Sequence, residues 1–169
     1  MAFNRPVGMR KLLLLVLVVA AGFIWLTSGD LPPVVASHFG AGGAANGFMA
    51  GRTYMAFMLA VVVAVPGLVG FSGQLVRVMP IRWINFPNKR YWLAPQRKAE
   101  TLESLSSLSV PLALALAVFL CFVHWLVVQA NAVQPARLPE RPLWVALAIL
   151  GVAVTLWLVV FFRRFGRVR

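Results

Sequence analysis

Four long apolar runs dominate the chain, and polar residues gather between them. The runs cover about residues 11–27, 53–73, 107–129 and 143–162, and their apolar cores contain no Asp, Glu, Lys or Arg. Each approaches the roughly 20 residues that a helix needs to cross a hydrocarbon core about 30 Å thick. Because the runs are continuously apolar, without the alternation of a lipid-facing strand, they predict transmembrane helices.

These runs predict an all-α fold: a polytopic membrane protein with a four-transmembrane-helix bundle, forming a single membrane domain over residues 1–169. The basic residues Arg5, Arg10 and Lys11 before an apolar run are also how a secretory signal begins. The first run ends in Trp25-Leu26-Thr27, however, and not in a clean small-x-small cleavage site. We therefore expect it to be retained as the first span.

Composition and charge support lipid as the surrounding medium. Of the 169 residues, 61% are hydrophobic and 12% charged, which is more apolar surface than one soluble core of that length hides. Of the 16 basic residues, 13 lie at or before the start of the first run, between the second and third, or after the fourth. Under the positive-inside rule, this asymmetry predicts that both termini and the central loop are cytoplasmic, the N-in/C-in topology. The net charge of +12 therefore indicates a bilayer with anionic headgroups as the partner and needs no nucleic acid.

Residues 28–52 are the first external loop in this topology, and we expect them to be ordered. Pro32-Pro33 stiffens the start of the loop, whereas Asn46-Gly47 and the other glycines permit tight turns. Phe39, Phe48 and Met49 are apolar anchors that can hold the loop over the bundle. The residues expected to form an outer recognition surface are Leu31, Pro32, His38, Phe39, Gly43, Asn46 and Gly47.

The central loop, residues 74–106, interleaves basic and aromatic side chains, a mixture that suits anionic headgroups at a membrane surface. A cationic loop of this kind is also suited to docking an acidic soluble regulator. A helix is expected to begin at Pro95 and to lead into the third span. The candidate contact residues of the loop are Asn85, Pro87, Asn88, Arg90, Tyr91, Trp92 and Arg97.

The second span carries small residues at helical spacing. Pro66-Gly67 is followed by Gly70 and Gly73. This series predicts a kink or a close contact between helices.

The chain offers little for catalysis. It has four carboxylates, and no GxSxG, HExxH, Walker or dinucleotide-binding motif accompanies them, so we expect it not to be an enzyme. Within the spans His124 is the one candidate for a charge, which argues against a proton-coupled transporter. Cys121 and His124 share a helix face, and His38 lies in the loop that can fold over them. Copper or zinc held by these three residues, in a subunit of a membrane enzyme, is one alternative, and a hydrogen-bonded structural His124 is the other.

Both loops carry a family resemblance. Leu31-Pro32, His38-Phe39, Gly42-Gly43 and Asn46-Gly47 stand in that order before the second span, and the stretch 84–95 is followed by Arg97 and Glu100-Thr101-Leu102. In these motifs the chain resembles the SdpI-type bacterial membrane proteins, in the N-terminal domain of unknown function found in SdpI immunity proteins. The resemblance covers about residue 12 to the end of the third span. Ala36 departs from it where a proline often stands, alanines replace the usual acidic turn residues, and Arg52 replaces a lysine. We also expect four spans, without the further helices of full-length SdpI-type proteins.

The resemblance implies an immunity or signalling component in the bacterial cytoplasmic (inner) membrane, acting on another membrane protein or a peptide. The lack of catalytic groups and the abundance of lipid-length helices also fit an accessory subunit of a larger membrane complex. In both cases we expect the protein to act by binding.

Overall fold

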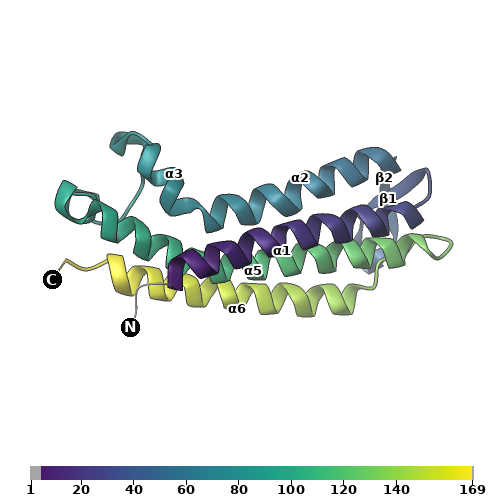
Figure 1. Ribbon diagram of the computed structural model, residues 1–169. Coiled ribbons are helices and arrows are strands. Elements are labelled where there is room, and N and C mark those ends of the chain that lie inside the picture. Colours follow the sequence, from purple (N-terminus) through teal and green to yellow (C-terminus); the bar gives the residue numbers. More distant parts are fainter. Residues whose placement is uncertain (1–4, 169) are drawn as a thin grey trace.

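The computed structural model describes residues 5–168 and consists mainly of four long helices that run side by side (Figure 1). These helices are α1 (Arg5–Thr27), α2 (Gly51–Gly70), α5 (Pro95–Asn131) and α6 (Glu140–Phe165). All four are long and apolar enough to cross a membrane, which confirms the prediction of a helical, multi-pass membrane protein. The predicted domain also includes residues 1–4 and 169, which lie outside the described residues.

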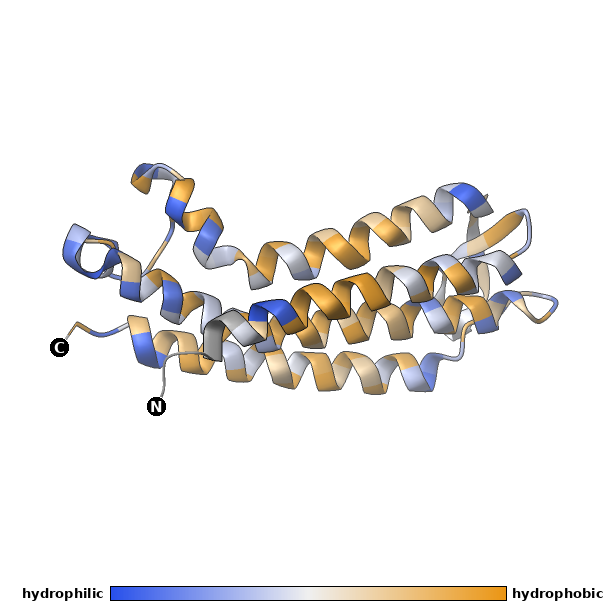
Figure 2. Ribbon diagram, viewed as in Figure 1, coloured by the Kyte–Doolittle hydropathy of each residue, from blue (hydrophilic) through white to orange (hydrophobic). Residues whose placement is uncertain are grey.

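The two ends of the bundle differ in what covers them. The start of α1 and the end of α6 lie at one end, which we call the terminal end (Figure 1). The opposite end, which we call the hairpin end, carries the segment between α1 and α2 and the segment between α5 and α6. Hydrophilic residues gather at both ends, and the length between them is hydrophobic (Figure 2). This banding matches a membrane-spanning bundle.

Helix α5 is the centre of the bundle and contacts α1, α2 and α6. It is a continuous helix from Pro95 to Asn131, so the helix predicted to start at Pro95 and lead into the third span is confirmed. Helix α6 packs on α5, and within its most apolar 18-residue stretch no residue is buried. Because apolar side chains exposed to water would be unfavourable over such a length, lipid is the medium that these surfaces fit.

Small residues let α2 and its continuation approach the neighbouring helices. A Cβ on Gly70 would overlap the side chain of Leu13, and a Cβ on Gly73 would overlap Ser106 Oγ and the Leu102 carbonyl oxygen. The α-helix ends at Gly70, and a separate helix, α3 (Ser72–Val78), continues in another direction (Figure 1). The small residues were predicted to give a kink or a close contact between helices, and the structure shows a change of helix direction after Gly70 with close contacts at Gly70 and Gly73.

The segment between α1 and α2 is ordered, as expected, but it is not merely a loop. After a short 3-10 turn (Ser28–Asp30), β1 (Val34–Phe39) and β2 (Ala45–Ala50) form an antiparallel hairpin around a second 3-10 turn (Ala41–Gly43). The all-α prediction did not include this two-stranded sheet. Its strands are short, and their residues do not alternate between apolar and polar, so no period-two pattern marks them in the sequence.

The central loop folds against the terminal end. It contains α3, a 3-10 turn (Ile81–Trp83) and the short helix α4 (Lys89–Trp92). A buried apolar cluster joins this loop to the first turns of α5 and the last turn of α6. The buried members are Ile84, Phe86, Leu93, Leu102, Leu105 and Phe165.

Candidate functional site

Asn131, the last residue of α5, ties the hairpin to the bundle. Its Oδ1 accepts a hydrogen bond from the Ala36 N–H at 2.8 Å, and its Nδ2 donates to the Ala36 carbonyl at 3.0 Å. The same Nδ2 donates to the Val127 carbonyl at 2.9 Å. The carboxamide therefore pairs with β1 as a neighbouring strand would. Because Ala36 is buried, losing this partner would leave backbone groups unsatisfied, at a cost of about 1–3 kcal/mol.

Two glycines at the tip of the hairpin join it to the segment 132–139. Gly42 and Gly43 have φ of 80° and 76°, which L side chains rarely adopt. The Gly42 N–H donates to Glu140 Oε1 at 2.7 Å, and its carbonyl accepts from Arg137 Nε at 3.0 Å. The Gly43 carbonyl accepts from the Leu138 N–H at 2.8 Å. We call β1, β2 and residues 132–139 the cap.

A cleft of about 570 Å³ opens between the two parts of the cap. One wall is the hairpin face that carries Val34 and Phe48, and the other is residues 134–137. Val34 and Phe48 are each 62% exposed. The polar side chains that line the cleft include Asn131 and Arg137. Apolar walls with a few placed polar groups are typical of binding sites.

The predicted outer recognition residues divide between the cleft and its scaffold. Pro32 lines the cleft. Leu31 and Phe39 pack against the core of the hairpin end. Gly47 lies opposite His38 in the hairpin, where a Cβ would come within 2.9 Å of the His38 Cβ. Gly43, as described, fits the tip against Leu138, whereas His38 and Asn46 are exposed.

Sequence reasoning missed the cleft-lining residues Val34, Asn131 and Arg137, and treated Phe48 only as an anchor. Asn131 lies 95 positions from its partner Ala36, so no local pattern relates them. The one available signal was an amide side chain just beyond the end of an apolar run. Such a residue is suited to capping exposed backbone groups.

His124 lies fully buried where α1, α2 and α5 meet. Its Nε2 is 2.8 Å from Thr27 Oγ1, and its Nδ1 is 3.0 Å from the Tyr54 hydroxyl. The Thr27 hydroxyl donates its single proton to the Phe23 carbonyl at 2.7 Å. It can therefore only accept from His124, which places the imidazole proton on Nε2 and leaves Nδ1 to accept from Tyr54. We call Thr27, Tyr54 and His124 the buried trio.

The structure does not gather the three predicted metal ligands. Among the described residues, no group of three His, Cys, Asp or Glu side chains comes together. His38 is exposed on β1, with Nδ1 at 3.2 Å from Ser37 Oγ, and Cys121 lines a groove between α1 and α5. Since both nitrogens of His124 have hydroxyl partners, the geometry favours the hydrogen-bonded histidine over a copper or zinc ligand.

The central loop binds the end of α6. Trp92 Nε1 donates to the Phe165 carbonyl at 2.8 Å, and Asn88 Nδ2 donates to the same oxygen at 3.2 Å. Thr101 Oγ1 in turn donates to the Trp92 carbonyl at 2.8 Å. Phe165 supplies one of the carbonyls that a helix end leaves without a partner in the helix. We call residues 84–93 the latch.

Other predicted residues of the central loop remain at the surface. The Arg97 guanidinium lies 4.0 Å from the centroid of the Tyr91 ring, a cation–π contact. Asn85 and Arg90 are exposed, and Pro87 is half-buried. Asn88 and Trp92 thus hold the fold together, whereas Arg90 and Arg97 stay exposed.

Comparisons with protein-family models, with curated protein sequences and with solved structures gave no significant match.

Proposed function

We propose that this chain is a non-enzymatic integral membrane protein that acts by binding, and that the cleft in its cap is the recognition site. The observation that carries the proposal is the pair of exposed apolar side chains, Val34 and Phe48, on one face of a fixed hairpin. The hairpin is held at its edge by Asn131 and at its tip by Gly42 and Gly43. A rigid scaffold of this kind lowers the entropy lost when a partner binds.

The chemistry of the cleft favours a partner with an apolar segment. Exposed aromatic and aliphatic side chains, once covered, supply much of the binding energy of an interface. Arg137 lines the cleft and uses its Nε for Gly42, which leaves its two terminal guanidinium nitrogens for an acceptor on the partner. An apolar peptide, or an apolar segment of another membrane protein, with a carbonyl or carboxylate nearby fits both features.

The proposed orientation places the cap outside the cell. Basic residues are concentrated at the terminal end, so the positive-inside rule supports cytoplasmic termini and a cytoplasmic latch. The resemblance to SdpI-type proteins supports the bacterial cytoplasmic membrane, with a role as an immunity or signalling component. An accessory subunit of a membrane complex would use the same cleft and would differ in remaining bound to its partner through purification.

Site-specific photocrosslinking tests this function. A benzophenone amino acid replaces Phe48 in the cleft or, as the control, Phe57, which is 56% exposed within the span α2. We expect Phe48 to crosslink a defined polypeptide in native membranes, and Val34→Asp to abolish that product. Phe57 should give lipid adducts only. Identical products from both positions, or none from Phe48, would contradict a recognition site in the cleft.

Gentle purification followed by mass spectrometry separates the two roles. An accessory subunit is expected to copurify with the crosslinked partner in a fixed ratio. An immunity or signalling component is expected to travel alone and to capture its partner only when the partner is present.

A further inference from the structure

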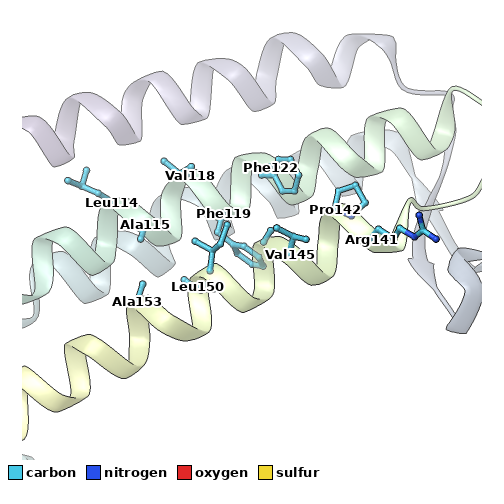
Figure 3. Close-up of a pocket in the computed structure, with 12 residues that line it drawn as sticks. Leu114, Ala115, Val118, Phe119, Phe122, Arg141, Pro142, Val145, Leu150 and Ala153 are labelled. Atoms are coloured by element: carbon cyan, nitrogen blue, oxygen red, sulfur yellow. The ribbon is translucent and has the colours of Figure 1, made fainter.

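Two apolar grooves flank helix α5. The larger, about 750 Å³, lies between α5 and α6, and the smaller, about 420 Å³, lies between α1 and α5. Val118 and Phe122 line both grooves and so form a ridge between them. Figure 3 shows these two side chains on α5, with α6 on one side and α1 on the other. Val118 is 65% exposed, so the ridge faces the lipid.

The larger groove has one charged side chain, Arg141, at the hairpin end (Figure 3). Within the described part of the chain, the Arg141 guanidinium makes no hydrogen bond or ion pair. The neighbouring charged residues lie outside this groove: Arg137 lines the cleft and donates to the Gly42 carbonyl, and Glu140 accepts from the Gly42 N–H. The groove therefore combines apolar walls with a single available cation at its mouth.

The length of the larger groove matches one leaflet. Its lining residues on α6 run from Arg141 to Ala153, which is about 18 Å at 1.5 Å per residue. Half of a hydrocarbon core about 30 Å thick is about 15 Å. Trp144, 65% exposed, lies one turn from Arg141, as expected of an aromatic ring at the headgroup level. Arg141 thus sits where a phosphate would be and the groove where an acyl chain would be.

We propose that the paired grooves bind one anionic diacyl phospholipid. One acyl chain occupies each groove, the two chains straddle the ridge of Val118 and Phe122, and the phosphate is held by Arg141. A guanidinium binds phosphate through charge-assisted, paired hydrogen bonds. Two grooves that share a ridge fit a two-chain lipid, whereas a single-chain amphiphile would fill only one.

The binding of phosphatidylglycerol to the delipidated full-length protein tests the headgroup contact, measured by native mass spectrometry. Arg141→Gln is expected to weaken binding about tenfold, because it removes a charge-assisted contact. The matched control is Arg52→Gln, which removes the exposed cation at the start of α2, outside both grooves. The control is expected to bind like the parent. Equal losses in both variants, or equal affinity of the parent for phosphatidylcholine, would overturn the proposal.

A second pair of variants tests the groove itself. Ala146→Phe fills the larger groove, and Ala148→Phe places the same ring on an exposed position of α6 outside it. Only Ala146→Phe is expected to weaken phosphatidylglycerol binding, and lysophosphatidylglycerol is expected to bind the parent about tenfold more weakly than the diacyl lipid. If Ala146→Phe fails to fold, the Arg141 comparison and the lysolipid comparison decide. Equal binding of both lipids, or a protein dimer that excludes lipid, would refute the two-chain site.

Discussion

At the scale of single residues, the buried trio shows how polar groups are accommodated within the spans. The three side chains form a chain of hydrogen bonds. The Tyr54 hydroxyl donates to His124, His124 donates to the Thr27 hydroxyl, and Thr27 donates to a carbonyl of its own helix. The Tyr54 ring also stacks on the imidazole, with centroids 5.6 Å apart. The trio joins α1, α2 and α5 near the hairpin end, so we expect it to contribute to stability by coupling three helices.

A double-mutant cycle measures that coupling. Tyr54→Phe removes one hydroxyl and is expected to lower the free energy of unfolding by about 0.6 kcal/mol, the average for hydrogen bonds between membrane helices, and by at most about 1.7 kcal/mol. His124→Leu should cost more, because it also leaves the Thr27 and Tyr54 hydroxyls without a partner. Unfolding in detergent–lipid mixtures gives the free energies. If the effects of the two substitutions simply add, the hydroxyl and the imidazole are not coupled.

Asn131 is expected to stabilise strand β1. Asn131→Leu removes the partners of the Ala36 N–H and carbonyl, so we expect faster hydrogen exchange across β1 and less stability by about 1–3 kcal/mol. Gln134→Leu is the matched control, because this exposed amide lines the cleft but does not pair with β1. Equal exchange in the parent and the Asn131 variant would show that β1 does not depend on this side chain.

Sequence reasoning reached some of these residues but not their partners. A hydrogen-bonded His124 was one of two predicted roles, and residue type and position were enough to suggest it. The hydroxyl groups that pair with His124 are determined by the rotation of three helices about their axes. Apolar helix faces contact lipid and protein alike, so the sequence carries little information on that rotation. For the same reason the sequence could not distinguish a structural histidine from a metal ligand.

At the scale of elements, the latch explains why the central loop is folded although it lies outside the spans. Phe165 is 1% exposed and contacts the rings of Phe86 and Trp92, with centroids 5.0 and 5.5 Å away. The end of α6 is thereby fixed to the start of α5. Basic and aromatic residues in this loop were predicted to meet lipid headgroups. Of its aromatic residues, Phe86 and Trp92 contact the end of α6, whereas Trp83 is exposed.

Weakening the latch should loosen the end of α6. Trp92→Phe retains the ring but removes the donor to the Phe165 carbonyl, so we expect faster hydrogen exchange in residues 160–166 and a loss of about 0.5–1.5 kcal/mol. Trp83→Phe serves as the control, because Trp83 is 66% exposed. Hydrogen-exchange mass spectrometry gives the comparison. An unchanged rate at the end of α6 would mean that apolar packing alone holds it.

Gly67 in α2 and Gly73 in α3 provide a matched pair of variants. Gly73→Ala places a methyl group against the Leu102 carbonyl oxygen, a backbone atom that cannot move away cheaply, so we expect a loss of about 1–3 kcal/mol. Gly67→Ala meets nothing within 4 Å and is expected to be neutral or slightly stabilising. Thermal unfolding of the two variants decides. Equal melting temperatures would contradict the close approach of α3 to α5.

Elements were predicted well where apolar length alone decides them and poorly elsewhere. The four helices follow from the continuous runs, and the break after Gly70 follows from its small residues. The hairpin does not follow, because its strands lack a period-two pattern and its outer edge at Ala36 is paired by an amide that lies far away in the sequence. Local propensity could not supply that partner.

At the scale of the whole molecule, the packing is one-sided. Helix α5 contacts each of the other three long helices, whereas α6 packs on α5 and leaves its apolar surface to the bilayer. The even number of spans places both termini at one end, and charge alone supports which side that end faces. The orientation is therefore the global property most in need of a direct test.

Cysteine accessibility provides that test. Cys121 is the only cysteine, so Cys121→Ser gives a thiol-free background. Asn46→Cys in the hairpin is expected to react with a membrane-impermeant maleimide in intact cells, and Gln96→Cys near the latch only after permeabilisation. Both sites are exposed, so accessibility reports the side of the membrane. The reverse pattern would invert the topology and place the cleft inside the cell.

The bonds of the cap also bear on biogenesis. The hairpin is translated early, but Asn131, Arg137 and Glu140, which hold it, leave the ribosome only after the third span has been made. Until then the Ala36 backbone lacks its partner Asn131. The segment that connects the first two spans is therefore completed only after α5 has been made. The last pair of spans then completes it, which makes insertion of α5 and α6 the step that renders the cleft competent to bind.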